Sequence, residues 1–184
     1  MTHVEPLKRI WNDDVVFEKL LHSKLDPNAR CSFSIAAMAL MLSVVETLGT
    51  FRSQKLKGKD RNRRAFFEFL SNHMNQWNVN VPNTTKLVAE VLWQSFRNGI
   101  THDLRVDRVS GVDQLWGSLE FQENFANTAN ARFEKHGQLL RICPRAFFED
   151  LEAGVKEYFA KLEEGNALLL NNFQSRFDEV YPNK

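Results

Sequence analysis

The sequence predicts a single, mainly α-helical domain with a small β-hairpin insert. Over most of the 184 residues, apolar side chains recur at spacings of three and four, the pattern of an amphipathic helix. Between about 104 and 142 they alternate with polar ones, as in short strands. The length and the 43% hydrophobic content fit one domain with a sizeable core. We expect residues 1–184 to form a bundle of five to six helices, with the insert following the fourth.

The first half of the chain predicts three helices. The first spans about 8–24. The second begins at Asp26-Pro27, a capping side chain followed by a proline at the first helical position, and is closed by Gly49. Its longest nearly apolar run has 11 residues, whereas a bilayer crossing needs about 20, so we expect a buried core helix and no membrane span. The third begins within or just after a basic stretch, and its apolar positions are Phe66, Phe67, Leu70, Met74 and Trp77.

The second half predicts a fourth helix, two or three strands and two more helices. Pro82-Asn83-Thr84 recaps the chain for the fourth helix, which ends near Arg97, before Gly99. Pro144 starts the next helix, and a last one spans about 166–180. The predicted face of the fourth helix consists of Leu87, Val88, Val91, Leu92, Ser95 and Phe96. The expected strands contain Leu104 and Val106, then Leu119, Phe121 and Phe125, then Leu140 and Ile142.

Charge and cysteine content narrow the function classes. A formal net charge of +1 gives no global attraction to nucleic acid or to a membrane surface, so any preference must come from local clusters. Cys31 and Cys143 lie far apart, outside metal-binding spacings and without a secretory signal, which predicts reduced thiols in the cytoplasm. His22, His73 and His136 are isolated from one another, so we expect no metal site and no cofactor.

The string FRNGITH, residues 96–102, is the strongest indication of chemistry. It places the permanent cation of Arg97, the amide of Asn98 and the titratable imidazole of His102 close together. Such groups bind a phosphate and move a proton beside it. The alternative is structural, because an arginine near a helix end often caps carbonyls or forms an ion pair, and a histidine beyond it often fixes a loop.

At RNGITH the chain resembles the HEPN superfamily, whose mark is an R-x4–6-H motif with a polar residue, often Asn, after the arginine. That family is a helical bundle, in agreement with the architecture predicted above. The resemblance implies a homodimer in which Arg97, Asn98 and His102 of the two subunits face each other and cleave RNA without a metal. Family toxins controlled by tyrosine modification carry the tyrosine where this chain has Leu104, so such control is not supported.

The chemistry of these groups suits that role. Arg97 would hold the scissile phosphate and stabilise its developing charge, because guanidinium grips phosphate oxygens in a fork. His102 would take the proton of the ribose 2′-hydroxyl or donate one to the leaving 5′-oxygen. Asn98 would orient the imidazole or donate to phosphate. The expected product carries a 2′,3′-cyclic phosphate.

Glu46 is a further catalytic candidate, since a charge on the apolar second helix needs a partner. Arg97 is a natural partner if the second and fourth helices pack together, and the resemblance allows an acidic residue of this helix in the active site. The alternative is a structural ion pair with Arg52 or another base.

Residues 55–64 carry six basic side chains against one acid, the strongest charge bias in the chain. They would follow an RNA backbone without reading its sequence, or they form a solvated loop. The basic residues are Lys55, Lys57, Lys59, Arg61, Arg63 and Arg64.

Together these observations predict a cytoplasmic, dimeric, metal-independent endoribonuclease. The resemblance adds a role as a toxin or a phage-defence effector, with RNA as one partner and an antitoxin or other neutralising protein as a second. Two alternatives stay open: a non-catalytic HEPN-like module that binds a nucleotide or a partner, and a helical regulatory protein whose motif is structural.

Overall fold

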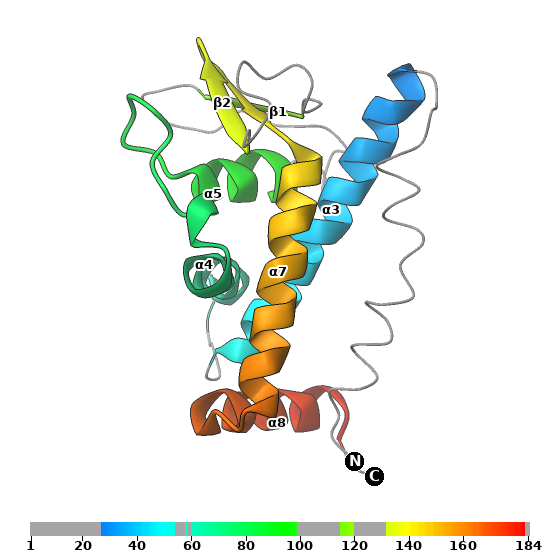
Figure 1. The fold of residues 1–184 in the computed structure, drawn as a ribbon, viewed down its shortest axis with the longest axis vertical. Helices are drawn as coiled ribbons and strands as arrows, with labels where there is room; N and C mark the ends of the chain where they lie inside the picture. Colours follow the sequence, from blue (N-terminus) through cyan, green and yellow to red (C-terminus); the bar gives the residue numbers. More distant parts are fainter. Residues whose placement is uncertain (1–26, 54–57, 59, 99–114, 120–131, 183–184) are drawn as a thin grey trace.

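The computed structural model describes residues 27–53, 58, 60–98, 115–119 and 132–182. In this part the chain is mainly helical, with one three-stranded sheet, which confirms the predicted fold class. Figure 1 shows α7 along the length of the molecule, α3 crossing it, the sheet at one end and α8 at the other. The helix predicted over 8–24 lies outside the described residues.

Helix α3 (Pro27–Arg52) starts at the predicted proline but does not end at Gly49. The prediction that the helix ends there was wrong, because Gly49 lies inside the helix, at the point where α3 crosses the next helix. A Cβ at this position would lie 2.1 Å from the backbone oxygen of Ala65 in α4 (Arg61–His73). Only glycine lets the two backbones approach so closely, and α3 continues for three more residues to Arg52.

Within the described residues, one helical window, Ile35–Arg52, is apolar and long enough to cross a membrane by length and composition alone. A core helix passes the same test, and α3 is one. Its side chains Met38, Met41, Leu42 and Val45 are fully buried in the main hydrophobic cluster. Helix α3 is therefore a core helix, as predicted.

A short 3₁₀-helix, η1 (Asn75–Trp77), follows α4. The predicted fourth helix then consists of two consecutive elements. It begins as α5 (Val88–Val91) and continues as η2 (Leu92–Asn98), which is a π-helix. The predicted inner face is correct, with Val88, Val91, Leu92 and Phe96 fully buried. The pattern did not predict the π-helix, a rare form that often occurs at functional sites. The observed third helix, α4, is also shorter than predicted: the apolar pattern continues to Trp77, whereas α4 ends at His73.

The sheet consists of β1 (Trp116–Leu119), β2 (Phe133–His136) and β3 (Leu139–Ile142), in the order β1-β3-β2. Strands β2 and β3 form a hairpin, which agrees with the predicted small β insert, although no strand was predicted at β2; β1 pairs in parallel with β3. Gly117 of β1 lies directly on η2, where a Cβ would come within 2.3 Å of the Phe96 ring. The sheet thus supports the segment that carries Arg97. The other expected strand residues, such as Leu104 and Phe125, lie outside the described residues.

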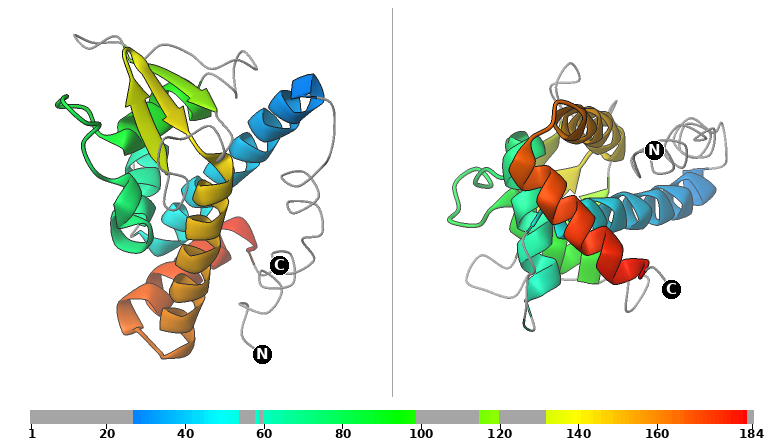
Figure 2. Two further views of the ribbon diagram at one scale, coloured as in Figure 1. Left: turned by 45° about the horizontal axis from the view of Figure 1, so that its top comes forward. Right: turned by 90° about the horizontal axis from the view of Figure 1, so that it is seen from below.

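The two C-terminal helices are confirmed as α7 (Pro144–Glu163) and α8 (Ala167–Val180). Pro144 occupies the first turn of α7, and the Asn166 side chain caps α8 by accepting a hydrogen bond from the Leu169 N–H at 3.1 Å. Seen from below, α8 lies across the ends of the other helices (Figure 2). It joins α3 through the Phe51 and Phe173 rings, whose centroids lie 5.2 Å apart.

Candidate functional site

Arg97 of η2 is held by Glu46 of α3 through two hydrogen bonds. Its Nε donates to Glu46 Oε2 at 2.7 Å and its Nη2 donates to Oε1 at 3.2 Å. The side chains are 22% and 14% exposed, respectively, so the pair lies at the margin of the core with access to solvent. The second and fourth predicted helices therefore pack together, and the partner of Glu46 is Arg97. Arg52, the alternative partner, contacts His73 instead.

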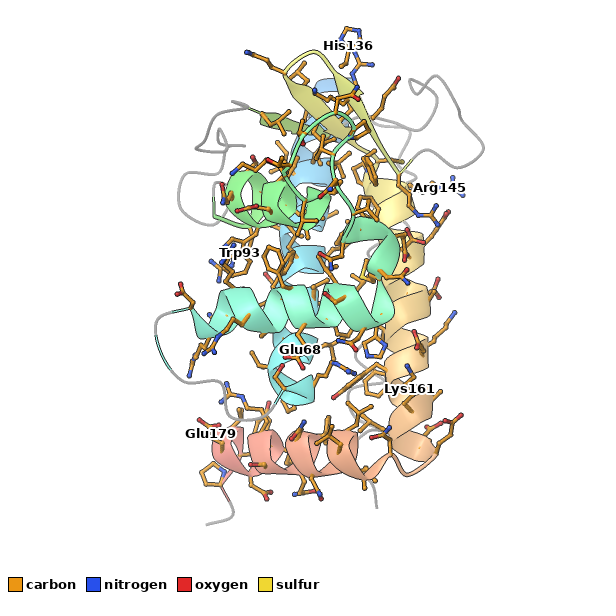
Figure 3. The ribbon with its side chains drawn as sticks, turned by 90° about the vertical axis from the view of Figure 1, so that its left-hand side faces the viewer. Glu68, Trp93, His136, Arg145, Lys161 and Glu179 are labelled. Carbon is orange, nitrogen blue, oxygen red and sulfur yellow. The ribbon has the colours of Figure 1, made fainter. Side chains whose placement is uncertain are left out.

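The Arg97 guanidinium lies over the indole ring of Trp93. The guanidinium carbon lies 5.0 Å from the ring centroid, within the range of a cation–π contact. Trp93 is only 8% exposed, and its other neighbour is the Phe66 ring of α4, 5.2 Å away between centroids. Figure 3 shows Trp93 between the α5–η2 segment and α4. Two elements besides η2 thus determine where the guanidinium lies.

Glycines bring these elements together. The contact of Gly49 with the backbone of Ala65 sets α3 close to α4, only one turn after Glu46. The contact of Gly117 with the Phe96 ring sets β1 against the residue that precedes Arg97. The position of the guanidinium is therefore a property of the packed core and not of an independent surface loop.

The first turn of α4 carries the described part of the basic stretch. Arg61, Arg63 and Arg64 are exposed there, at the positive end of the helix dipole, where basic side chains are unfavourable. Arg63 reaches α5, with its Nη2 3.6 Å from a carboxylate oxygen of Glu90. That carboxylate also accepts a hydrogen bond from Gln94 at 3.0 Å. The basic turn of α4 therefore borders the same α5–η2 segment that carries Arg97.

The structure brings together only some of the predicted site residues. Arg97 and Glu46 are joined, and the three arginines of α4 lie on a neighbouring element. Only the backbone of Asn98 is described, as the last residue of η2. His102 and the lysines Lys55, Lys57 and Lys59 lie outside the described residues. Their roles stay predictions.

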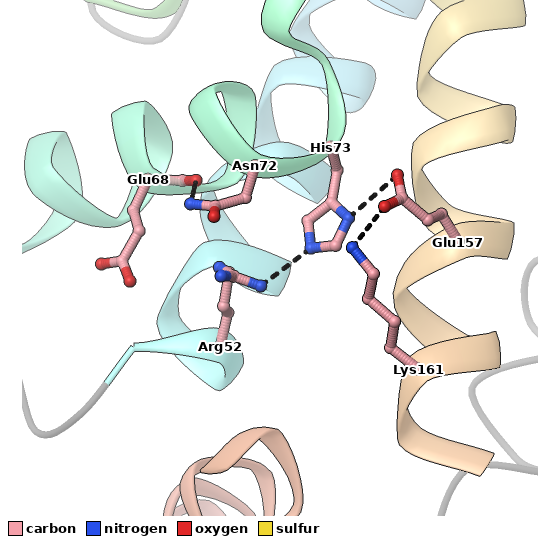
Figure 4. Close-up of polar contacts among 6 residues, drawn as sticks. All are labelled: Arg52, Glu68, Asn72, His73, Glu157 and Lys161. Atoms are coloured by element: carbon pink, nitrogen blue, oxygen red, sulfur yellow. Dashed lines mark hydrogen bonds and ion pairs between the residues drawn. The ribbon is translucent and has the colours of Figure 1, made fainter. Parts of the chain in front are cut away.

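A second polar cluster joins α3, α4 and α7 (Figure 4). Its centre is His73, whose side chain is 0% exposed. Arg52 donates to His73 Nε2 at 3.0 Å, and because arginine has no acceptor, the ring proton must be on Nδ1. That atom faces Glu157 Oε2 at 3.4 Å, and Glu157 also pairs with Lys161. Burial and the Arg52 charge lower the pKa of His73 to about 4.

The contacts of this second cluster hold helices together. The neutral imidazole is enclosed by the rings of Phe69 and Tyr158, with centroids 5.0 Å and 5.7 Å from its own. Asn172 of α8 donates to the backbone oxygen of Arg52 at 2.7 Å, which ties the last helix to the same junction. A histidine that is neutral and fully enclosed has no access to a substrate, so His73 fixes the helix junction.

In the part of the chain that the structure describes, the remaining candidates for chemistry form no site. Cys143 is a buried free thiol, and burial raises its pKa, which keeps it protonated and unreactive. Among the residues that the structure describes, no three His, Cys, Asp or Glu side chains lie close enough to hold a metal ion.

Sequence reasoning missed Trp93 and the junction at His73. A signal for Trp93 was present, because an aromatic residue four positions before an arginine on a helical segment lies on the same side of it. No comparable signal existed for His73, whose partners Arg52 and Glu157 are 21 and 84 positions away in the sequence. Comparison of the chain with protein-family models, with curated proteins and with solved structures found no match.

Proposed function

We propose that the protein is a HEPN-like, metal-independent endoribonuclease whose site contains Arg97, Asn98 and His102. The observation that carries the proposal is the fixed guanidinium of Arg97. It is oriented by two bonds to Glu46 and by the face of Trp93, and it retains contact with solvent. A preorganised cation of this kind suits the stabilisation of charge that develops on a phosphate.

In the proposed reaction, Arg97 binds the phosphate and His102 transfers the proton. Arg97 binds the non-bridging oxygens of the scissile phosphate, and Glu46 fixes its orientation. His102 removes the proton of the 2′-hydroxyl, whose oxygen attacks the phosphorus, and the 5′-oxygen of the next nucleotide leaves with a proton. One product then ends in a 2′,3′-cyclic phosphate and the other in a 5′-hydroxyl.

The remaining parts of the proposal follow from the resemblance to HEPN proteins and from the basic turn. Arg61, Arg63 and Arg64 contact the RNA backbone without reading its sequence. Two copies of the chain bring two motifs to one cleft. The proposed setting is the cytoplasm, where the protein acts as a toxin or a defence effector under the control of a neutralising protein.

The Glu46–Arg97 pair also supports a second candidate function, a helical module that binds a partner without chemistry. A carboxylate with two bonds to the guanidinium offsets its charge, as in an ion pair that serves only the fold. In this case Arg97 contributes to stability and to nothing else.

An RNA cleavage assay separates the two candidates. The purified protein is incubated with single-stranded RNA in EDTA and compared with Arg97→Ala and His102→Ala. Matched controls are Arg145→Ala, which removes an arginine 51% exposed on α7, and His136→Ala on β2. The nuclease predicts a loss of about 100-fold or more in rate for the motif variants, and none for the controls. Absence of cleavage by the wild type, or a change confined to thermal stability, contradicts it.

A further inference from the structure

We propose that Trp93 is a positioning residue for Arg97: its indole face fixes the plane of the guanidinium that Glu46 holds in place. The consequence for RNA cleavage rests on the function proposed above. The geometry itself is independent of it and is measurable without RNA.

The ion pair alone does not fix the twist of the guanidinium plane. Glu46 binds one edge of the guanidinium through Nε and Nη2, which fixes the distance and direction of the group. Twisting of the guanidinium plane about the line of the pair changes both bonds only slightly. The indole of Trp93, whose centroid lies 5.0 Å from the guanidinium carbon, opposes that twist.

The indole is well anchored for this role. Trp93 is nearly buried and packs on the Phe66 ring of α4, so it cannot follow the guanidinium if the latter turns. It also lies four positions before Arg97 in the same π-helix, whereas Glu46 belongs to α3. Glu46 of α3 and Trp93 of η2 thus both orient Arg97.

The indole orients the cation without cancelling its charge. A second carboxylate in its place would also fix the plane, but it would make the site negative and repel phosphate. The π face attracts a cation through its quadrupole and has no net charge. This arrangement orders the guanidinium and leaves the Glu46–Arg97 pair at zero net charge, whereas a second carboxylate would make it negative.

The first test measures the geometry in the absence of RNA. Arg97→Ala removes the guanidinium and leaves Glu46 and Trp93 in place. Added ethylguanidinium at millimolar concentration is expected to raise the melting temperature of this variant more than ethylammonium, which has the same charge and no flat face. The same shift is expected in Arg97→Ala/Trp93→Phe and is abolished in Arg97→Ala/Trp93→Met. Equal shifts in both double variants overturn the proposal.

A measurement on the wild type covers the case in which the methionine variant does not fold. The Cδ protons of Arg97, assigned by their disappearance in Arg97→Ala, should show an upfield ring-current shift in the NMR spectrum, because the adjoining guanidinium carbon lies over the indole ring. Unshifted protons contradict the proposed geometry, whatever the Trp93 variants do.

The second test measures the consequence for RNA. Trp93→Met is expected to lower kcat about 10-fold with little change in KM, the scale of effect when a cation–π interaction is removed from a partly desolvated site. Trp93→Phe should retain most of the wild-type kcat. Phe147→Met, a matched replacement of a ring beside Trp77 in the core, should change neither constant.

These outcomes separate the two proposals. A wild type that does not cleave RNA refutes the nuclease, while the ethylguanidinium shifts still decide the role of Trp93. An active wild type whose Trp93→Met and Phe147→Met variants lose kcat equally refutes positioning, because the loss then follows stability alone.

Discussion

Replacing His73 with glutamine should make the protein less sensitive to mild acid. The imidazole is fully buried at the junction of α3, α4 and α7, and it accepts a hydrogen bond from Arg52 on Nε2. A proton on that nitrogen would break the bond and place two cations 3.0 Å apart. Burial, followed by the Arg52 charge, lowers the folded-state pKa of His73 to about 4, against 6.5 for an ordinary histidine.

The sign and size of the effect follow from linkage. The unfolded chain binds a proton at His73 below pH 6.5, whereas the folded chain does so only near pH 4, so acid favours the unfolded state. Stability from this group is complete above pH 6.5 and falls as the pH drops toward 4, by about 3 kcal/mol in total. Between pH 7.5 and pH 5 the loss is about 2 kcal/mol, a large part of the stability of a small domain.

The assay is urea unfolding followed by far-ultraviolet circular dichroism at pH 7.5 and pH 5. His73→Gln is a suitable variant, because its amide oxygen can accept from Arg52 and its nitrogen can face Glu157 without titrating. The pKa of Glu157 is lowered chiefly by its hydrogen bond to Lys161, which the variant retains, and to a smaller extent by His73. The wild type should lose about 2 kcal/mol more than the variant between the two pH values. His136→Gln, an exposed control, should behave as the wild type, and equal slopes in all three proteins would refute the reasoning.

Two further changes test the packing. Gly49→Ala should lower the free energy of unfolding by about 2 kcal/mol despite the better helix propensity of alanine, because the new Cβ meets the Ala65 backbone oxygen at 2.1 Å; an unchanged or raised urea midpoint would contradict this. Asp150→Asn removes the charge that accepts two bonds from Arg132, at 2.7 Å and 3.1 Å, and should cost about 2 kcal/mol in the same assay. Glu149→Gln, which breaks an exposed pair on the same helix, should cost less than about 0.5 kcal/mol, and equal losses would mean that the Asp150 pair has no special weight.

The sequence predicted the elements whose signals are local. Pro27 and Pro144 marked helix starts, and the apolar spacing of the fourth helix identified its buried face. Gly49 was misread because its role depends on α4, which reaches it only in the folded chain. A glycine after an apolar helix is typical of a C-terminus, and local pattern alone does not distinguish a stop from a crossing.

For the candidate site, the sequence likewise predicted only what depends on local pattern. The charge of Glu46 on an apolar helix required a base, and the predicted partners were Arg97 and, as the alternative, Arg52 or another base. The choice between Arg97 and Arg52 depended on how the helices cross, which the sequence does not specify. The same holds for Trp93, whose contact with Arg97 also depends on the π-helical form of η2 and on the support from α4.

The most direct test of the proposed function is the chemistry of the cleaved ends. An oligonucleotide of deoxyribose units with a single ribose is incubated with the protein in EDTA, and the products are identified by mass spectrometry. The proposal predicts one cut, directly 3′ of the ribose, which leaves a 2′,3′-cyclic phosphate and a 5′-hydroxyl and disappears in Arg97→Ala. Cleavage at deoxyribose positions, 5′-phosphate ends, or no cleavage by the wild type would contradict it.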